Sequence, residues 1–208
     1  LASQGKYEEA MPYYVEALEG NRRVLGDEHP STLWSINSMG DLLFRQGKYD
    51  EAMPYYVEAL EGKRRVLGDE HPSTLSSISN MGLLLSDLGK YDEAMPYCVE
   101  DLETTRRVLG DEHPDTLGSI NNMVTLLVQQ GAHEKAGPLA LECYALNVMV
   151  YGNDHQETID AIDLLIKLHD AWHEVEPDAG HDAKADEYRQ LLEAIEAKKA
   201  ETTEPAAP

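Results

Sequence analysis

The chain has 208 residues, of which 42% are hydrophobic, and a formal net charge of −22 from 17 basic and 39 acidic residues. That apolar fraction is sufficient for a folded core. The acidic excess argues against nucleic-acid and membrane-surface binding, because both need a basic surface. No run of about 18 apolar residues predicts a membrane span. Two cysteines, Cys98 and Cys143, are too few for a disulfide scaffold, and with no signal-peptide pattern we expect a cytoplasmic protein.

The dominant pattern in the chain is an internal repeat of 42 residues. Gly5, Gly47, Gly89 and Gly131 each begin a unit. The second unit differs from the first at 9 of 42 positions, and the third differs from the second at 12. The fourth unit is much diverged, and a fifth partial copy begins at Gly180. A fixed period of this size is typical of proteins built from stacked supersecondary units.

The start of the chain predicts a missing partner. Residues 1–4 resemble the end of a helix, and the first residue is Leu rather than Met. We therefore expect a fragment of a longer array. The helix predicted over residues 6–25 would expose the face that a preceding helix should cover.

Each unit contains two helical patterns. In the second unit, residues 49–67 carry Ala52, Tyr56 and Ala59 at helical spacing, with Pro54 inside the helix. The next pattern, residues 73–88, follows Pro72 and precedes Gly89, which suit the first turn and the stop of a helix. Its apolar positions share one face: Leu75, Ile78, Met81, Gly82 and Leu85. No strand pattern occurs, so one unit is an antiparallel helix pair whose core is completed by stacking.

The end of the chain departs from the repeat. A helix is predicted over residues 157–175, followed by a turn over 173–180 that contains Pro177. An amphipathic helix follows over residues 182–199, as expected of a cap. We divide the chain into a repeat array (1–178), a capping helix (179–200) and a disordered tail (201–208).

The residues of the repeat resemble a known family. The spacing Ile78-x-x-Met81-Gly82-x-x-Leu85, continued by Gly89 and then by Tyr91, Ala94 and Cys98, resembles the tetratricopeptide repeat (TPR) signature. The longer unit, with Leu-Gly-Asp-Glu-His-Pro between its helices, resembles the repeats of kinesin light chains and covers about residues 1–170. The resemblance implies an all-α fold, a right-handed α-solenoid superhelix of stacked antiparallel helix pairs. It also implies that the helices corresponding to residues 73–88, which are the first helices of the family's repeat, line a concave groove.

The units differ most along one stripe of the helix that corresponds to residues 73–88. Seven of the nine differences between the first two units lie in that helix, and five follow the spacing of one helical face. These five are Trp34, Asn37, Asp41, Phe44 and Arg45. Two interpretations compete: drift of exposed positions, or a groove that offers a partner a different side chain at each step. Trp34 and Phe44 would be aromatic anchors for a partner, unless missing upstream helices cover them.

We therefore predict a non-catalytic protein-interaction module that binds a protein or peptide in the concave groove, without cofactor or metal. Asn37 and Asn121 are expected to hydrogen-bond a peptide backbone, and a ligand with apolar anchors and neutral or mildly basic flanks fits best. Two alternatives stay open: a structural spacer that self-associates through the uncovered N-terminal helix over residues 6–25, and an accessory arm of an enzyme. The predicted groove residues are Trp34, Asn37, Asp41, Phe44, Arg45, Ser79, Leu83, Asn121, Thr125, Val128, Gln129 and Lys167.

Other chemically suggestive groups favour structural interpretations. The Asp-Glu-His triplets ending at His29, His71 and His113 lie in the turns between helices, where adjacent side chains point apart and cannot share one metal ion. Arg pairs such as Arg64-Arg65 lie at the end of the helix predicted over residues 49–67 and of its equivalents. Cations there suit the helix dipole and can pair with loop carboxylates, with an anion-binding ridge as the alternative. Cys98 and Cys143 occupy apolar positions, which favours small core residues over reactive thiols. No nucleophile with a matching base and no phosphate-binding loop is present, so catalysis has no candidate site.

Overall fold

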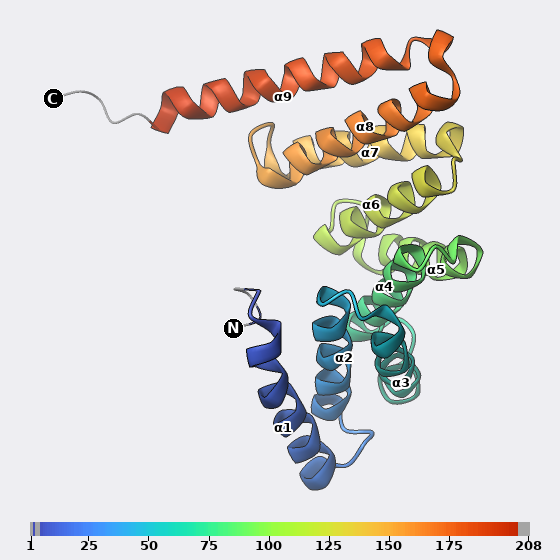
Figure 1. The fold of residues 1–208 in the computed structure, drawn as a ribbon, viewed down its shortest axis with the longest axis vertical. Helices are drawn as coiled ribbons and strands as arrows, with labels where there is room; N and C mark the ends of the chain where they lie inside the picture. The colour runs from blue at the N-terminus through green and yellow to red at the C-terminus, as the bar shows by residue number, and fades with distance from the viewer. Residues whose placement is uncertain (1, 3–4, 204–208) are drawn as a thin grey trace, which may run out of the picture. The chain divides into compact units, whose positions relative to one another are not determined.

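A computed structural model describes residue 2 and residues 5–203, the side chains of 200–203 excepted. Within these residues every element is helical, in the order shown in Figure 1. The predicted all-α, stacked helix-pair class is confirmed. Residues 1, 3 and 4, which were expected to belong to the end of a helix, and the tail beyond residue 203 lie outside the described part.

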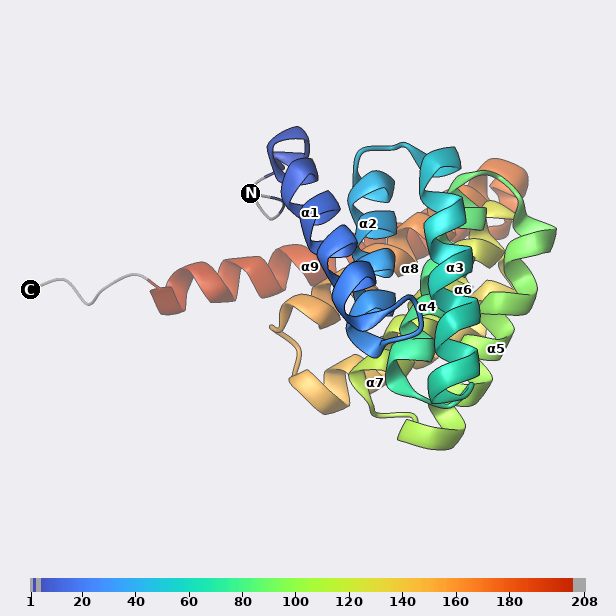
Figure 2. The same cartoon turned by 90° about the horizontal axis from the view of Figure 1, so that it is seen from below.

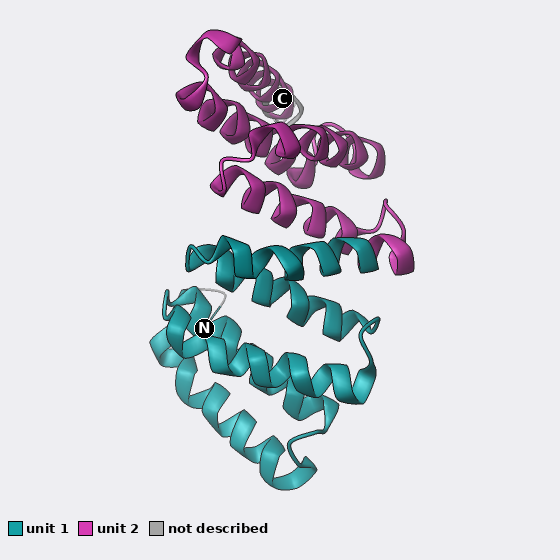
Figure 3. Ribbon diagram, turned by 90° about the vertical axis from the view of Figure 1, so that its right-hand side faces the viewer, with its two compact units in different colours: residues 1–104 teal, residues 105–208 magenta. Residues whose placement is uncertain are grey.

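Contacts divide the chain into two compact units that are larger than one 42-residue repeat. The first unit is Leu1–Thr104 and the second is Thr105–Pro208 (Figure 3). The first unit contains four complete helices: α1 (Tyr7–Leu25), α2 (Pro30–Arg45), α3 (Tyr49–Leu67) and α4 (Pro72–Asp87). The helix α5 (Tyr91–Leu109) runs across the boundary. The second unit contains α6 (Pro114–Gln129), α7 (His133–Tyr151), α8 (Gln156–Val175), the short helix η2 (Pro177–Ala179) and α9 (His181–Thr203). Figure 2 shows the same helices from below.

The turns explain why the helices begin and end where they do. His29 caps α2, because its Nδ1 accepts a hydrogen bond from the backbone N–H of Ser31 at 3.1 Å, and Pro30 follows at the first helical position. His71 and His113 cap α4 and α6 in the same way. The preceding helices α1 and α3 stop at Gly26 and Gly68, whose φ of 86° favours glycine.

Both units bury the apolar faces that the repeat pattern predicts. In the first unit Leu18, Leu33 and Ile36 form a buried cluster with Ala59, so α2 packs between α1 and α3. In the second unit Ile159 and Ile162 of α8 pack against Ile195 of α9. The helix α9 thus covers α8, although it ends at Thr203, beyond the predicted start of the tail at residue 201.

None of the helices in the described part of the chain is both long enough and apolar enough to cross a membrane.

Candidate functional site

In the first unit the predicted stripe lies partly at the surface and partly inside the fold. Trp34 is 66% exposed, and Arg45 is also exposed. The remaining members are more covered: Asp41, Phe44, Ser79 and Leu83 are half-buried, and Asn37 is buried. The helical spacing therefore identified one face of the helix, but the degree of exposure along that face varies from residue to residue.

Asn37 differs from the expectation that its amide would bind a peptide backbone. Its Oδ1 accepts hydrogen bonds from Ser77 Oγ at 2.8 Å and from Lys63 Nζ at 3.3 Å. Its Nδ2 donates to Asp41 at 3.1 Å, and only 8% of the residue is exposed. Both ends of the amide are thus used where α3 and α4 pack on α2, which the pattern of one helix could not reveal.

Asp41 is held by a network of donors. It accepts hydrogen bonds from Tyr56 Oη at 2.8 Å and from Asn80 Nδ2 at 3.0 Å, besides the one from Asn37. Burial raises the pKa of Asp41, and the hydrogen bonds from Tyr56 and Asn37 oppose that shift. Burial lowers the pKa of Lys63 to about 8, opposed by the charge of Asp41. Sequence reasoning missed Lys63. The available signal was a lysine at a position where the other 42-residue repeats have Asn or Thr.

The two aromatic residues of the stripe have different surroundings. Phe44 packs on Tyr49 and Tyr56, with ring centroids 5.3 and 6.4 Å away, so it is part of an aromatic cluster rather than a protruding anchor. Trp34 stays accessible and lines an apolar groove of about 260 Å³ between α1 and α2 together with Tyr13 and Ala17.

In the second unit a single groove between α6 and α8 brings five predicted residues together. It has a volume of about 460 Å³. The five residues are Asn121, Thr125, Val128, Gln129 and Lys167. Val128 and Leu164 supply apolar surface, while Asp160 and Asp163 outnumber the one cation, Lys167. The groove can therefore bury an apolar side chain and attract positive charge beside it.

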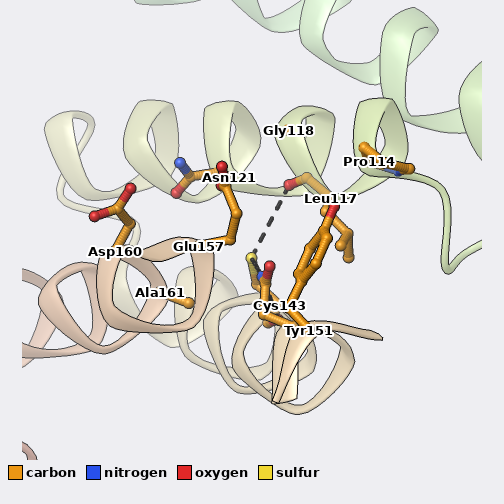
Figure 4. Close-up of a pocket in the computed structure, with 10 residues that line it drawn as sticks. Pro114, Leu117, Gly118, Asn121, Cys143, Tyr151, Glu157, Asp160 and Ala161 are labelled. Carbon is orange, nitrogen blue, oxygen red and sulfur yellow. Dashed lines mark hydrogen bonds between the residues drawn. The ribbon is translucent and has the colours of Figure 1, made fainter. Parts of the chain in front are cut away.

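A smaller cavity of about 120 Å³ adjoins this groove and shares Asn121 and Asp160 with it. Figure 4 shows Asn121 of α6 beside Glu157 and Asp160 of α8, with Tyr151 of α7 on the other side. Sequence reasoning did not identify this cavity, because it forms only where three helices meet.

The acidic turns and Arg pairs are engaged in structural contacts. The Nε of Arg106 in α5 lies 3.3 Å from Asp111 in the following turn. The Nη2 of Arg106 donates to Glu142 of α7 at 2.6 Å. Arg22 and Arg64 make the equivalent pairs in the first unit. These ladders favour the predicted pairing with loop carboxylates over an anion-binding ridge. Within the described residues no group of three or more His, Cys, Asp or Glu side chains could hold a metal ion.

Both cysteines are free thiols in the interior, as their apolar positions predict. Burial raises the pKa of each thiol to about 11. Negative charge adds to the effect, from Asp101 at Cys98 and from Glu142 and Glu157 at Cys143, while a hydrogen bond from Asn147 opposes it at Cys143. Neither thiol has the low pKa that a reactive cysteine needs.

Comparison with solved structures places the fold among TPR-like repeat proteins. A variant of a candidate kinesin light chain of Podosopora anserina, with nearly identical TPR-like repeats, has a TM-score of 0.75 at 21% identity, over 98% of this chain and 91% of that one. BtubC (BKLC) from P. vanneervenii has a TM-score of 0.78 at 21% identity, over 100% of this chain and 79% of that one. A search of curated protein sequences found no match.

The sequence itself matches the family model of the tetratricopeptide repeat three times, over residues 1–65, 35–97 and 74–147. These matches together cover residues 1–147, which is more than half of the chain. Proteins of this fold generally act as non-catalytic scaffolds for protein interaction. The chain therefore belongs to the tetratricopeptide repeat family.

Proposed function

We propose that this chain is a non-catalytic adaptor that binds an extended segment of a partner protein in the groove between α6 and α8. The observation that carries the proposal is the groove between α6 and α8, where Val128 and Leu164 provide apolar surface among polar side chains. Such a preformed groove loses little conformational entropy on binding a peptide.

The charges of the groove favour a partner segment with basic flanks. Asp160 and Asp163 stand against Lys167, and the whole chain has a net charge of −22. A basic segment would be attracted over a long range, whereas an acidic one would be repelled. In the first unit, Trp34 and Arg45 are the stripe residues that a partner can reach most readily.

A peptide-library screen against the whole chain tests the proposal. Val128→Asp should weaken binding of the selected peptides at least about tenfold, because it places a charge on the apolar surface. The control is Val150→Asp, an exposed valine of α7 outside the groove. Both variants should keep the helical circular dichroism of the wild type. Equal affinity of both variants for the selected peptides would refute the groove as the binding site.

A second candidate function, self-association through α1, has its own support. The helices α1 and α3 share 17 of 19 residues. Tyr56 and Ala59 of α3 are covered by neighbouring helices, whereas Tyr14 is half-buried and Ala17 exposed on α1. A second copy of the chain would cover this face.

Sedimentation separates the two candidates. Self-association predicts a mass that rises with concentration and that Ala17→Glu reduces to the monomer, while Val15→Glu on another face of α1 does not. A monomeric wild type at all concentrations rules this second candidate out and leaves peptide binding in the groove untouched.

A further inference from the structure

One polar position of α1, α3 and α5 contacts a serine of the helix that follows. The contact recurs every 42 residues in three of the four cases. Its distances are 2.8 Å from Asn21 Nδ2 to Ser35 Oγ, 2.7 Å from Lys63 Nζ to Ser77 Oγ and 3.4 Å from Thr105 Oγ1 to Ser119 Oγ. The fourth pair in register is Asn147 and Ala161, and alanine has no hydroxyl group to complete it.

The pair of Lys63 and Ser77 shows how a lysine side chain fills this position. The ammonium group of Lys63 is enclosed between α2 and α4, and the residue is 4% exposed. Besides Ser77, it donates to Oδ1 of Asn37. A shift of two 42-residue repeats, or 84 residues, maps Ser77 onto Ala161 and Asn37 onto Asn121. The same shift maps Lys63 onto Asn147.

In the second unit the equivalent place is the 120 Å³ cavity. Asn147 is too short to fill it, and its Nδ2 turns back to the carbonyl of Cys143 in its own helix at 2.8 Å. Gly118 also lines the cavity, and a Cβ built on this glycine would meet no atom within 4 Å. The space that a lysine side chain fills in the first unit is therefore open in the second.

The walls of the cavity have also changed in charge. Glu157 and Asp160 lie beside Asn121 at its edge (Figure 4). The positions equivalent to Asp160 hold Trp34, Ser76 and Gly118. Among these positions, only the fourth 42-residue repeat therefore has a carboxylate. The apolar side chains of Leu117 and Tyr151 complete the lining, as a chain of methylene groups would require.

We propose that this cavity binds the primary ammonium group of a lysine side chain that a partner segment inserts from the adjoining groove. The inference rests on the proposed peptide binding, because groove and cavity share Asn121 and Asp160. The three N–H donors of an ammonium group match the two carboxylates and the Oδ1 of Asn121. Lys63 is the internal template for this arrangement.

Binding can be measured with the probe N-acetyl-lysine methylamide, by NMR titration of the ¹⁵N-labelled chain. Saturable shifts are expected at the side-chain amides of Asn121 and Asn147. N-acetyl-norleucine methylamide, which lacks only the ammonium group, should bind at least about tenfold more weakly. Equal binding of both probes would overturn the proposal. Tighter binding of free cadaverine than of the lysine amide would also overturn it, since a free diamine would then be the ligand.

Two variants test the location of the site. Asn147→Lys combined with Ala161→Ser rebuilds the internal pair of the first unit and should abolish binding of the lysine amide. Glu157→Gln, at an exposed position, should weaken binding about fivefold with an unchanged melting temperature, and it keeps the test valid if the double variant does not fold. Wild-type affinity in Glu157→Gln, or in a folded double variant, would refute the cavity as the site.

The failure of this inference and that of the proposed function give different results. If library peptides bind and Val128→Asp removes them, but the lysine amide does not bind, the groove proposal holds and the ammonium site is wrong. If the lysine amide binds and Glu157→Gln weakens it, but no library peptide binds, the groove proposal is wrong and so is a lysine delivered from it.

Discussion

Gly40 of α2 lies directly against the ring of Tyr56 of α3, because a Cβ built on Gly40 would be 2.7 Å from two ring carbons. The equivalent pair in the next 42-residue repeat is Gly82 and Cys98, where a Cβ would lie 2.9 Å from the sulfur. In the second unit the pair becomes Val124 and Ala140, both fully buried. A larger residue on the first helix thus goes with a smaller residue on the second, as dense packing requires.

This size relationship predicts a rescue. Gly40→Val should destabilise the chain by about 3 kcal/mol, because Tyr56 is buried and cannot move aside. Adding Tyr56→Ala recreates the pair found at Val124 and Ala140. The double variant should therefore lose less free energy of unfolding than the two single variants lose together, by at least about 1 kcal/mol. Urea unfolding measures all three variants.

The control for overpacking is Gly20→Ala in α1, where a Cβ would meet no atom within 4 Å. This variant should be neutral or more stable by up to about 1 kcal/mol, since alanine is the better helix former. Strict additivity of Gly40→Val and Tyr56→Ala would contradict the packing relationship.

The buried Lys63 predicts an alkaline gain in stability. Its pKa is lowered by burial to about 8 in the folded chain, against an ordinary value of 10.5. Between these values the unfolded chain binds more protons than the folded chain, so the free energy of unfolding rises as the pH rises from about 8 to 10.5. Lys63→Met removes this group and should flatten the rise.

Urea unfolding of wild type and Lys63→Met at pH 7.5 and 9.5 measures this difference. Taking the difference between the two proteins cancels the titration of the tyrosines and other lysines. A constant difference at both pH values would mean that Lys63 keeps its ordinary pKa in the folded chain.

The buried His169, which contacts His181, predicts a loss of stability in acid. The Nδ1 atoms of His169 and His181 lie 3.3 Å apart, so one must donate and the other accept, and two charged rings cannot share this contact. The pKa of His169 is lowered by burial, then by Lys184 and His181, while Asp170 opposes the shift. Stability is therefore present above the ordinary histidine pKa of 6.5 and is lost as the pH falls toward the lowered value.

The comparison is between wild type and His181→Gln, unfolded in urea at pH 7.5 and 5.5. The wild type should lose more stability on acidification than the variant, which retains a neutral partner for His169. Trp172, whose ring centroid lies 4.1 Å from that of His181, reports the change by fluorescence in a Trp34→Phe background. Equal losses in both proteins would exclude the pair as their source.

The thiols of Cys98 and Cys143 predict slow chemistry. Both are buried, and the pKa of each is raised to about 11, so little thiolate exists at pH 8. A thiol reagent such as iodoacetamide should modify the native chain at least about a hundredfold more slowly than the urea-unfolded chain. Rapid labelling of either cysteine in the native chain would show that its helix pair opens locally.

The repeat itself made much of the fold predictable from the sequence. The 42-residue period, Pro72 at the start of a helix and Gly89 after its end placed the helices of the second 42-residue repeat within a residue or two of their observed bounds. These are local signals: a ring that fixes φ and a glycine that accepts positive φ act on the backbone wherever they occur. The helical stripe that contains Thr125 and Val128 followed from the same local periodicity.

The tertiary structure decided which stripe residues a partner can reach. Asn37 and Asn121 occupy equivalent positions in the sequence, yet Asn37 is buried against Lys63 and Asn121 is exposed at the edge of a cavity. The difference arises from Lys63 and Asn147, which lie 26 residues further along the chain in each case. A helical period describes one helix, whereas burial and pKa depend on the side chains that neighbouring helices bring within a few ångströms.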